Sequence, residues 1–419
     1  MDKNRESFYK GSFGLERETL RIDAKKRLSQ APHPFTDKAI TRDFCENQTE
    51  LVTPVCGSVH GAVSELERLD KKARATLKKL GEDFWVYSNP PRFDSESQIP
   101  IADFSGEEIS KRIYREHLQR RYGKRLMLYC GVHFNFSFCE EYLRSICDRQ
   151  DFEGFCADFY LRLYKQVFVH SWLLVLLTAA SPVYDLSLDG DGKRGAVRSS
   201  YASIRNSERG YWNSFVPVLR FGSIGEFVDS IQEYADAGKL HSAWELYLPV
   251  RLKPRGENCL ENLKKGVSHI ELRMFDLDPK QRLGVNEKDL EFAHLLLMYL
   301  SQLPDFELTA KMQIQAVKNH KNAALSDLTG IEIDGEGMIK RAAEIIDDMK
   351  WFFAGDKQAL ELIEEQRCKL YHRPCMTVRT KDIYQTDREG GDNVRVARFF
   401  RKRAYRYSHT AAGVLLALR

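Results

Sequence analysis

The sequence has no Cys-x-x-Cys pair, and its nine cysteines are scattered over 419 residues. An odd number of scattered thiols is not typical of a disulfide framework, and thiolate zinc sites use closely spaced pairs. The polar N-terminal residues, MDKNRES, lack the apolar segment of a signal peptide. We therefore expect free thiols in a reducing compartment, and a cytoplasmic protein.

Long apolar runs are also absent. The most hydrophobic run, residues 167–180 (VFVHSWLLVLLTAA), includes His170 and is shorter than the roughly 20 residues that a membrane-spanning helix needs. It predicts a buried core helix and no membrane partner.

Neither sign of charge dominates, since 64 basic and 60 acidic residues give a net charge of +4. Such a balance does not indicate a nucleic-acid partner. The tail at residues 393–406 (NVRVARFFRKRAYR) is basic and carries aromatic residues, a combination that can grip single-stranded nucleic acid. A solvated helix that packs its aromatics on the body is the preferred interpretation, and contact with ATP phosphates or a second subunit stays open. We expect a monomer or a small homo-oligomer.

Three common catalytic signatures are missing: a serine or cysteine nucleophile motif, a dinucleotide fingerprint and a phosphate loop. The glycine-rich residues 188–195 (LDGDGKRG) lack both the Gly-Lys-Ser/Thr ending of a phosphate loop and the terminal acid of a calcium loop. They predict a mobile segment and no ligand site.

The hydrophobic content of 43% is enough for a large core, and the residue pattern alternates between strands and helices. Mixed strands with helices outside them predict an α+β protein. Alternating apolar residues predict strands at 8–22, 126–138, 244–252 and 268–275, with an extended or mixed segment at 39–55. Helical spacing predicts helices at 57–80, 107–123, 140–180, 224–237, 287–303, 310–324, 336–354 and 357–370, with irregular segments at 88–105 and 181–212.

Two acids lie two residues apart in the first predicted strand. Glu16 and Glu18, in GLERETLRI at 14–22, point to the same side because strand side chains alternate. Asp43 and Glu50 follow, but a separation of seven residues does not put them on one face of a regular strand. Either a bulge or a helical turn must intervene, and the sequence does not say which.

Two more strands present a polar face opposite an apolar one. His133 lies on the polar face of the strand at 126–138, and Glu271 and Arg273 lie on that of 268–275. Each face alone is usually solvated, and a lone strand histidine is usually structural. Three strands that each present acids or imidazole together favour a cage for Mg²⁺ or Mn²⁺ that positions a nucleotide triphosphate.

With these residues, the chain resembles the bacterial glutamate-cysteine ligases (γ-glutamylcysteine synthetases), and in particular the ligase half of the fused bacterial glutathione-making enzymes. The matching segments run in family order over residues 8–285. They are GLERETLR (14–21), DFCENQTELVTP (43–54), YRE (114–116), RYG (121–123), GVHFNFS (131–137), SIRNSERGY (203–211), ELYLPVR (245–251) and HIELRMFDLDP (269–279).

The resemblance implies a glutamine-synthetase-like fold, in which a curved antiparallel sheet forms a funnel surrounded by helices. One catalytic domain would span residues 1–419, with a mostly helical part at 286–419. The implied reaction is ATP-dependent phosphorylation of the glutamate γ-carboxylate, followed by attack of the cysteine amine on γ-glutamyl phosphate. This is the first step of glutathione biosynthesis, and without the second half of the fused enzymes the chain would stop at the dipeptide. Two or three Mg²⁺ ions, or Mn²⁺, would assist, with ATP as co-substrate.

The resemblance also implies a role for each matching position. Glu18, Asp43 and Glu50 are similar to the ligands of one metal ion, and Glu16, His133 and Glu271 to those of a second that bridges to ATP. Arg273, with Glu271, is similar to the catalytic pair at the transferred phosphoryl group. The implied cysteine pocket consists of Phe44, Tyr114, Arg205 and Tyr211. Tyr247, Arg251 and Asn135 are implied for nucleotide or glutamate.

Three alternatives remain open from the sequence. A related γ-glutamyl or carboxylate-amine ligase would use another amine, and a catalytically silent protein would keep the scaffold for binding or regulation. The third alternative is nucleic-acid binding through the basic tail. Intact acids at every cage position argue against a silent protein.

Overall fold

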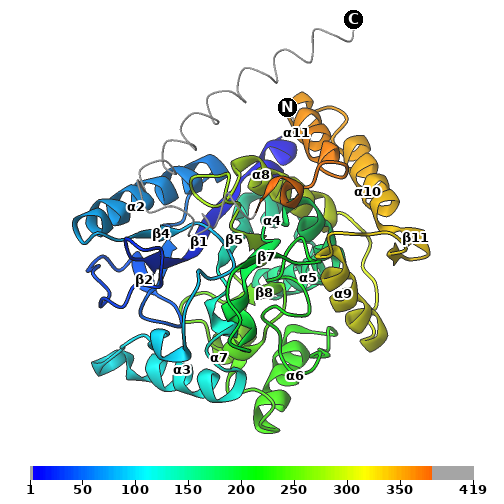
Figure 1. Cartoon of the computed structure of the whole chain (residues 1–419). Coiled ribbons are helices and arrows are strands. Elements are labelled where there is room, and N and C mark those ends of the chain that lie inside the picture. The colour runs from blue at the N-terminus through cyan, green and yellow to red at the C-terminus, as the bar shows by residue number, and fades with distance from the viewer. Residues whose placement is uncertain (1–2, 380–419) are drawn as a thin grey trace, which may run out of the picture. The chain divides into compact units, whose positions relative to one another are not determined.

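A seven-stranded antiparallel sheet organises residues 3–379, the part of the chain that this computed structural model describes (Figure 1). This confirms the α+β class and the antiparallel sheet. The predicted single domain over 1–419 stays a prediction, because the basic tail at 393–406 lies outside the described residues. The strand order is β2 (Ile40–Arg42), β3 (Gln48–Val52), β1 (Gly11–Ile22), β5 (Gly131–Phe138), β9 (His269–Asp276) and β8 (Val250–Lys253), and β4 (Asp83–Trp85) also pairs with β1.

Helices α2 (Val59–Lys79), α5 (Phe152–Thr178) and α8 (Glu287–Ser301) cover one face of this sheet. The aromatic face of β1 and β5 packs on α8, where the rings of Phe13 and Phe136 lie 4.9 Å and 4.8 Å from the imidazole of His294. Phe138 contacts Phe159 of α5 at 5.3 Å. The opposite face carries Glu16 and Glu18, and we call it the acidic face.

The predicted helices are confirmed, with small changes at their ends. The hydrophobic run at 167–180 lies mostly in the buried α5, and among the described residues no helix combines the length and the apolar character needed to cross a membrane. The other predicted helices are α3 (Ile109–Tyr122), α4 (Glu140–Ile146), α6 (Ile224–Asp236), α9 (Ala310–Ala323), α10 (Met338–Phe352) and α11 (Lys357–Cys368). Two short helices, α1 (Lys3–Tyr9) and α7 (Leu260–Lys265), were not predicted. All nine cysteines are free thiols, as predicted.

Two local predictions were wrong. The segment from Asp43 to Glu50 holds neither a bulge nor a helical turn but the turn of the β2–β3 hairpin, in which the Asp43 N–H donates to the Gln48 carbonyl at 3.1 Å. The chain reverses there, so the two acids approach from neighbouring strands. The strand predicted at 244–252 begins only at Val250, because Pro249 has no N–H to donate to a ladder.

The predicted irregular segment at 181–212 contains two short strands. Strands β6 (Val183–Asp185) and β7 (Ala196–Arg198) pair with each other, and the glycine-rich residues connect them. Gly190 has a φ of +80°, a left-handed conformation that favours glycine. Strands β10 (Glu332–Ile333) and β11 (Glu336–Gly337) form a second small hairpin.

A buried ion pair fixes α2 against the back of β1. The Arg17 side chain is 3% exposed, and its guanidinium donates to Asp70 at 2.7 Å. We expect Asp70→Ala to lower the free energy of unfolding by about 3–5 kcal/mol, because it leaves a buried guanidinium without its carboxylate. Denaturant unfolding measures this loss.

The matched control is Glu67→Ala on the same helix, where the carboxylate is 39% exposed and pairs with Lys71. We expect this control to change stability by less than about 0.5 kcal/mol. Equal effects of the two substitutions would contradict a structural role for the Arg17–Asp70 pair.

Candidate active site

The strand register brings the predicted cage residues onto the acidic face. Glu16 on β1 lies directly opposite His133 on β5, and Glu18 lies opposite Glu50 on β3. Directly opposite residues in an antiparallel pair project to the same face with their Cβ atoms about 5 Å apart. The structure therefore brings together side chains that are more than 100 residues apart in the sequence.

A β-bulge on β9 brings Met274 to the same cavity as Arg273. Between Val132 and Phe134, β5 has one residue, His133, whereas the matching part of β9 has two, Arg273 and Met274. An extra residue interrupts the strict alternation and re-aims nearby side chains. Arg273 and Met274 consequently both line the cavity at this face, although simple alternation predicted opposite faces for them.

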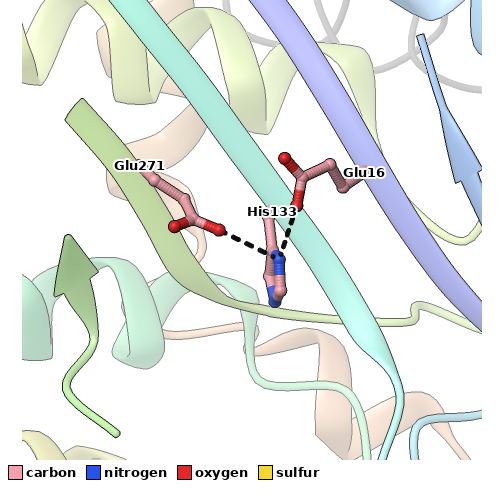
Figure 2. Close-up of side chains that lie close together, drawn as sticks. All are labelled: Glu16, His133 and Glu271. Carbon is pink, nitrogen blue, oxygen red and sulfur yellow. Dashed lines mark hydrogen bonds and ion pairs between the residues drawn. The ribbon is translucent and has the colours of Figure 1, made fainter. Parts of the chain in front are cut away.

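The imidazole of His133 lies at the centre of the cage (Figure 2). Its Nδ1 is 3.2 Å from Glu16 Oε2 and 3.2 Å from Glu271 Oε1, and its Nε2 is 3.5 Å from Glu18 Oε1. One potential ligand atom from each of Glu16, His133 and Glu271 lies within 4.8 Å of the other two. These atoms form a three-ligand set of two carboxylates and one imidazole, contributed by three strands.

Glu271 is completely buried and surrounded by cations. Arg273 is 3.0 Å from its Oε1, and Lys253 is 3.2 Å and Arg251 4.0 Å from its Oε2. Burial alone would raise the pKa of Glu271, but the positive charges of Lys253 and Arg273 hold this pKa well below its ordinary value. Glu271 is therefore a carboxylate.

Burial and the charge of Arg273 would lower the pKa of His133. The negative charge of Glu18 and hydrogen bonds to Glu16 and Glu271 outweigh them, so this pKa is raised. Burial and Glu271 would raise the pKa of Glu16, yet the hydrogen bond from His133 and the charge of Lys253 lower it. The imidazole therefore serves as a counter-charge for the surrounding acids.

The second predicted ligand group, Glu18, Asp43 and Glu50, gathers at the β1–β3 side of the cage. Burial and the neighbouring charges of Glu16 and Asp43 raise the pKa of Glu50 well above its ordinary value. Burial also raises the pKa of Glu18. The positive charge of His133 opposes this shift, and the negative charge of Asp43 adds to it. Carboxylates that disfavour each other's ionisation in this way gain from a shared cation.

One cavity of about 240 Å³ contains these groups, somewhat below the roughly 300–1,000 Å³ of typical ligand sites. Every predicted site residue lines it except Asn135, whose amide donates to Glu16 Oε1 at 3.2 Å. The lining thus includes Glu16, Glu18, Asp43, Phe44, Glu50, Tyr114, His133, Arg205, Tyr211, Tyr247, Arg251, Glu271 and Arg273.

An aromatic wall closes one side of the cavity. The rings of Tyr211 and Tyr247 are 4.0 Å apart, and burial raises the pKa of both phenols well above the ordinary value, so both are neutral. Burial likewise raises the pKa of Tyr114 to about 12. Arg205 packs on the β5 backbone at Gly131, where a Cβ would overlap its guanidinium.

Several lining residues were missed by the sequence reasoning. Lys253 lies one residue beyond the predicted strand at 244–252 and two residues from Arg251, so continuing the alternation would have found it. His320, from α9, gave no such signal, because it reaches the cavity only through the packing of a distant helix. Arg115, Tyr129, Asn206, Trp212 and Trp244 also line the cavity.

Comparison with known proteins agrees with the resemblance seen in the sequence. The family model of glutamate-cysteine ligase matches residues 1–241 and 217–323. The glutathione biosynthesis bifunctional protein GshAB of Clostridium perfringens is 37% identical over 338 residues, which cover 76% of this chain and 43% of that protein. GshAB of Listeria monocytogenes serotype 4b is 33% identical over 425 residues, covering 93% of this chain and 54% of that protein. The chain therefore spans about half the length of these curated relatives.

Two crystal structures share the fold. A bifunctional glutathione synthetase from Pasteurella multocida has a TM-score of 0.77 and 24% identity, covering 96% of this chain and 53% of that one. A glutamate–cysteine ligase from Francisella tularensis in complex with AMP has the same TM-score and identity, covering 96% of this chain and 89% of that one. With the sequence matches, these likenesses lead to one conclusion: the chain belongs to the glutamate-cysteine ligase family.

Proposed function

We propose that this protein joins the γ-carboxylate of L-glutamate to the amine of L-cysteine at the expense of ATP, giving γ-glutamylcysteine in the cytoplasm. The observation that carries this proposal is the three-ligand set of Glu16, His133 and Glu271 beside Arg273, in a chain of the glutamate-cysteine ligase family. The product would be the first intermediate of glutathione biosynthesis.

The residues fit divalent metal ions. The donors are carboxylates and one imidazole, which suit Mg²⁺ or Mn²⁺, and Glu271 Oε2 is a buried oxygen without an aligned hydrogen-bond donor. Glu16, His133 and Glu271 would hold one ion, and Glu18, Asp43 and Glu50 another. When bound, the ions supply positive charge between two anions that otherwise repel each other, the substrate carboxylate and the ATP triphosphate.

The protein's own groups would position the two chemical steps. In the first, an oxygen of the glutamate γ-carboxylate attacks the γ-phosphorus, the bond to the β,γ-bridging oxygen breaks, and ADP leaves with that electron pair. The Arg273 guanidinium neutralises charge on the moving phosphoryl group. In the second, the cysteine amine attacks the acyl carbon, the carbon–oxygen bond breaks, phosphate leaves and the amine loses a proton.

The nucleotide would lie along the acidic face away from Tyr211. Asn135 and Ser137 follow His133 on that face, and Ser137 lines a second cavity together with Ser12, Arg255 and other residues. We propose that the base and ribose occupy this second cavity while the triphosphate extends to Glu271. The aromatic wall then stays free for the amino-acid acceptor.

Release of phosphate from ATP, measured over a panel of amines, tests the function. We expect turnover that requires glutamate and Mg²⁺ together, with cysteine and 2-aminobutyrate as acceptors. Turnover of another amine with both of these idle would instead support the alternative, a γ-glutamyl or carboxylate-amine ligase with a different acceptor.

Tyr211→Ala tests the acceptor pocket. Because the ring belongs to the aromatic wall and is not part of the cage, we expect the KM for cysteine to rise by about 10-fold or more, the loss of roughly 1.4 kcal/mol of binding. The KM for ATP should change less than twofold. Initial rates against each substrate measure both constants, and equal changes would remove this residue from the acceptor pocket.

A further inference from the structure

Lys253 contributes a positive charge to the cage from the end of β8. It is the last residue of β8, its side chain is 15% exposed, and its ammonium lies 3.2 Å from Glu271 Oε2. The ammonium is at ion-pair distance but off the hydrogen-bonding direction, since Oε2 has no aligned donor. That oxygen is therefore available to a metal ion that approaches from the cavity.

Each of the two arginines beside Glu271 makes at least one side-chain hydrogen bond, whereas the Lys253 ammonium makes none among the described residues. Arg251 donates to the carbonyls of Trp244 and Leu246 at 3.1 Å and 3.3 Å, and Arg273 donates to Glu271 Oε1 at 3.0 Å. Among the described residues, the Lys253 ammonium has Glu271 as its one ion-pair partner. A lysine head on a flexible stem of four carbons can also move where a planar guanidinium cannot.

The positive charges around Glu271 oppose the binding of a divalent ion. Three cationic side chains already face this single carboxylate, and an ion bound to Glu16, His133 and Glu271 would add two further positive charges within a few ångströms. Repulsion between them is strong in a buried site, where water screens little. It falls if Lys253 leaves Glu271, and an anionic triphosphate is the partner that would receive the ammonium.

We propose that the Lys253 ammonium competes with a divalent ion for the site at Glu16, His133 and Glu271. When the nucleotide binds, the ammonium moves to the transferred phosphate, and the divalent ion can then bind. This inference rests on the proposed function, because it takes ATP as the nucleotide. Metal and nucleotide then strengthen each other's binding, since coupling between two sites is reciprocal. The device would keep the cage from holding a metal ion before the nucleotide arrives.

Binding of Mn²⁺, followed by the paramagnetic resonance signal of the free ion, tests the inference without turnover. Wild type should bind the cage ion weakly alone and at least about 10-fold more tightly with the β,γ-methylene analogue of ATP, within the usual range of coupling. Lys253→Met should bind it about 10-fold more tightly than wild type without the analogue, and gain little when the analogue is added. In Lys253→Arg, the gain in Mn²⁺ affinity on adding the analogue should be smaller than in wild type and larger than in Lys253→Met.

Lys264→Met is the matched control, because this lysine on α7 is 56% exposed and pairs with Asp229. Its Mn²⁺ binding should equal that of wild type. Equal or weaker binding by Lys253→Met without nucleotide would overturn the inference, and Lys253→Gln repeats the test if the first variant does not fold. If wild type binds no Mn²⁺ even with the analogue, the metal site of the proposed function fails as well.

Discussion

Glu271→Gln is expected to abolish the proposed ligation, with a fall in kcat of about 10³-fold, the upper range for removing one electrostatic contact at a reacting centre. The side chain is completely buried, and its carboxylate contacts His133, Arg273 and Lys253. The amide keeps the size but removes the negative charge. This weakens the proposed metal ligand and leaves the cations without a counter-charge. Phosphate release at saturating substrates measures the loss.

Two further measurements separate chemistry from folding in this variant. The far-ultraviolet circular dichroism should stay that of wild type, because Gln fills the same space. Glu261→Gln removes an exposed carboxylate from α7 and should retain full activity. Near-normal turnover of Glu271→Gln at ordinary Mg²⁺ would contradict the metal assignment.

Arg273→Met is expected to lower kcat by about 10²–10³-fold while changing the KM for glutamate much less. This guanidinium lies on the same face of β9 as Glu271, to which it donates at 3.0 Å. Charge on the migrating phosphoryl group develops mainly in the transition state, so its loss affects kcat more than substrate binding. Arg273→Lys should recover only part of the rate, because an ammonium lacks the two-pronged geometry of a guanidinium.

Glutamate-dependent formation of ADP without an acceptor isolates the phosphoryl step. We expect Arg273→Met to slow this partial reaction as much as complete ligation. Arg282→Met removes an arginine that is 56% exposed and pairs with Glu67, and it should behave as wild type. A normal partial reaction in Arg273→Met, with only ligation impaired, would move this arginine to the second step.

The helices were the most predictable part of the fold. The apolar spacing of α2 and α8 and the hydrophobic run of α5 are local sequence patterns, so they predict these helices without any knowledge of tertiary contacts. The turn at 43–47 and the late start of β8 were not predictable in the same way. The hairpin depends on backbone hydrogen bonds between the two strands that flank the chain reversal. The segment before Val250 contains a proline and the buried Glu245, whose carboxylate accepts a hydrogen bond from Tyr122 and pairs with Arg121, both on α3.

The cage residues could be nominated from alternation, but their meeting point could not. Alternation put Glu16 and Glu18 on one side of a strand. It also put His133 and Glu271 on the polar faces of two other strands. Register and strand order then decided that His133 faces Glu16 and that β9 lies beside β5. Those pairings join distant segments, so no window of sequence contains them.

The sequence by itself determined which residues have acidic, imidazole or cationic chemistry, which sides of each strand they occupy and which family they resemble, because those properties are carried by residue type and short spacing. Only the tertiary structure decided that a bulge adds Met274 to the cavity lining beside Arg273, that Lys253 reaches Glu271 and that His320 lines the cavity from α9. Such contacts arise when separate elements pack their apolar faces together. That packing depends on residues from many parts of the chain, so no short stretch of sequence determines it.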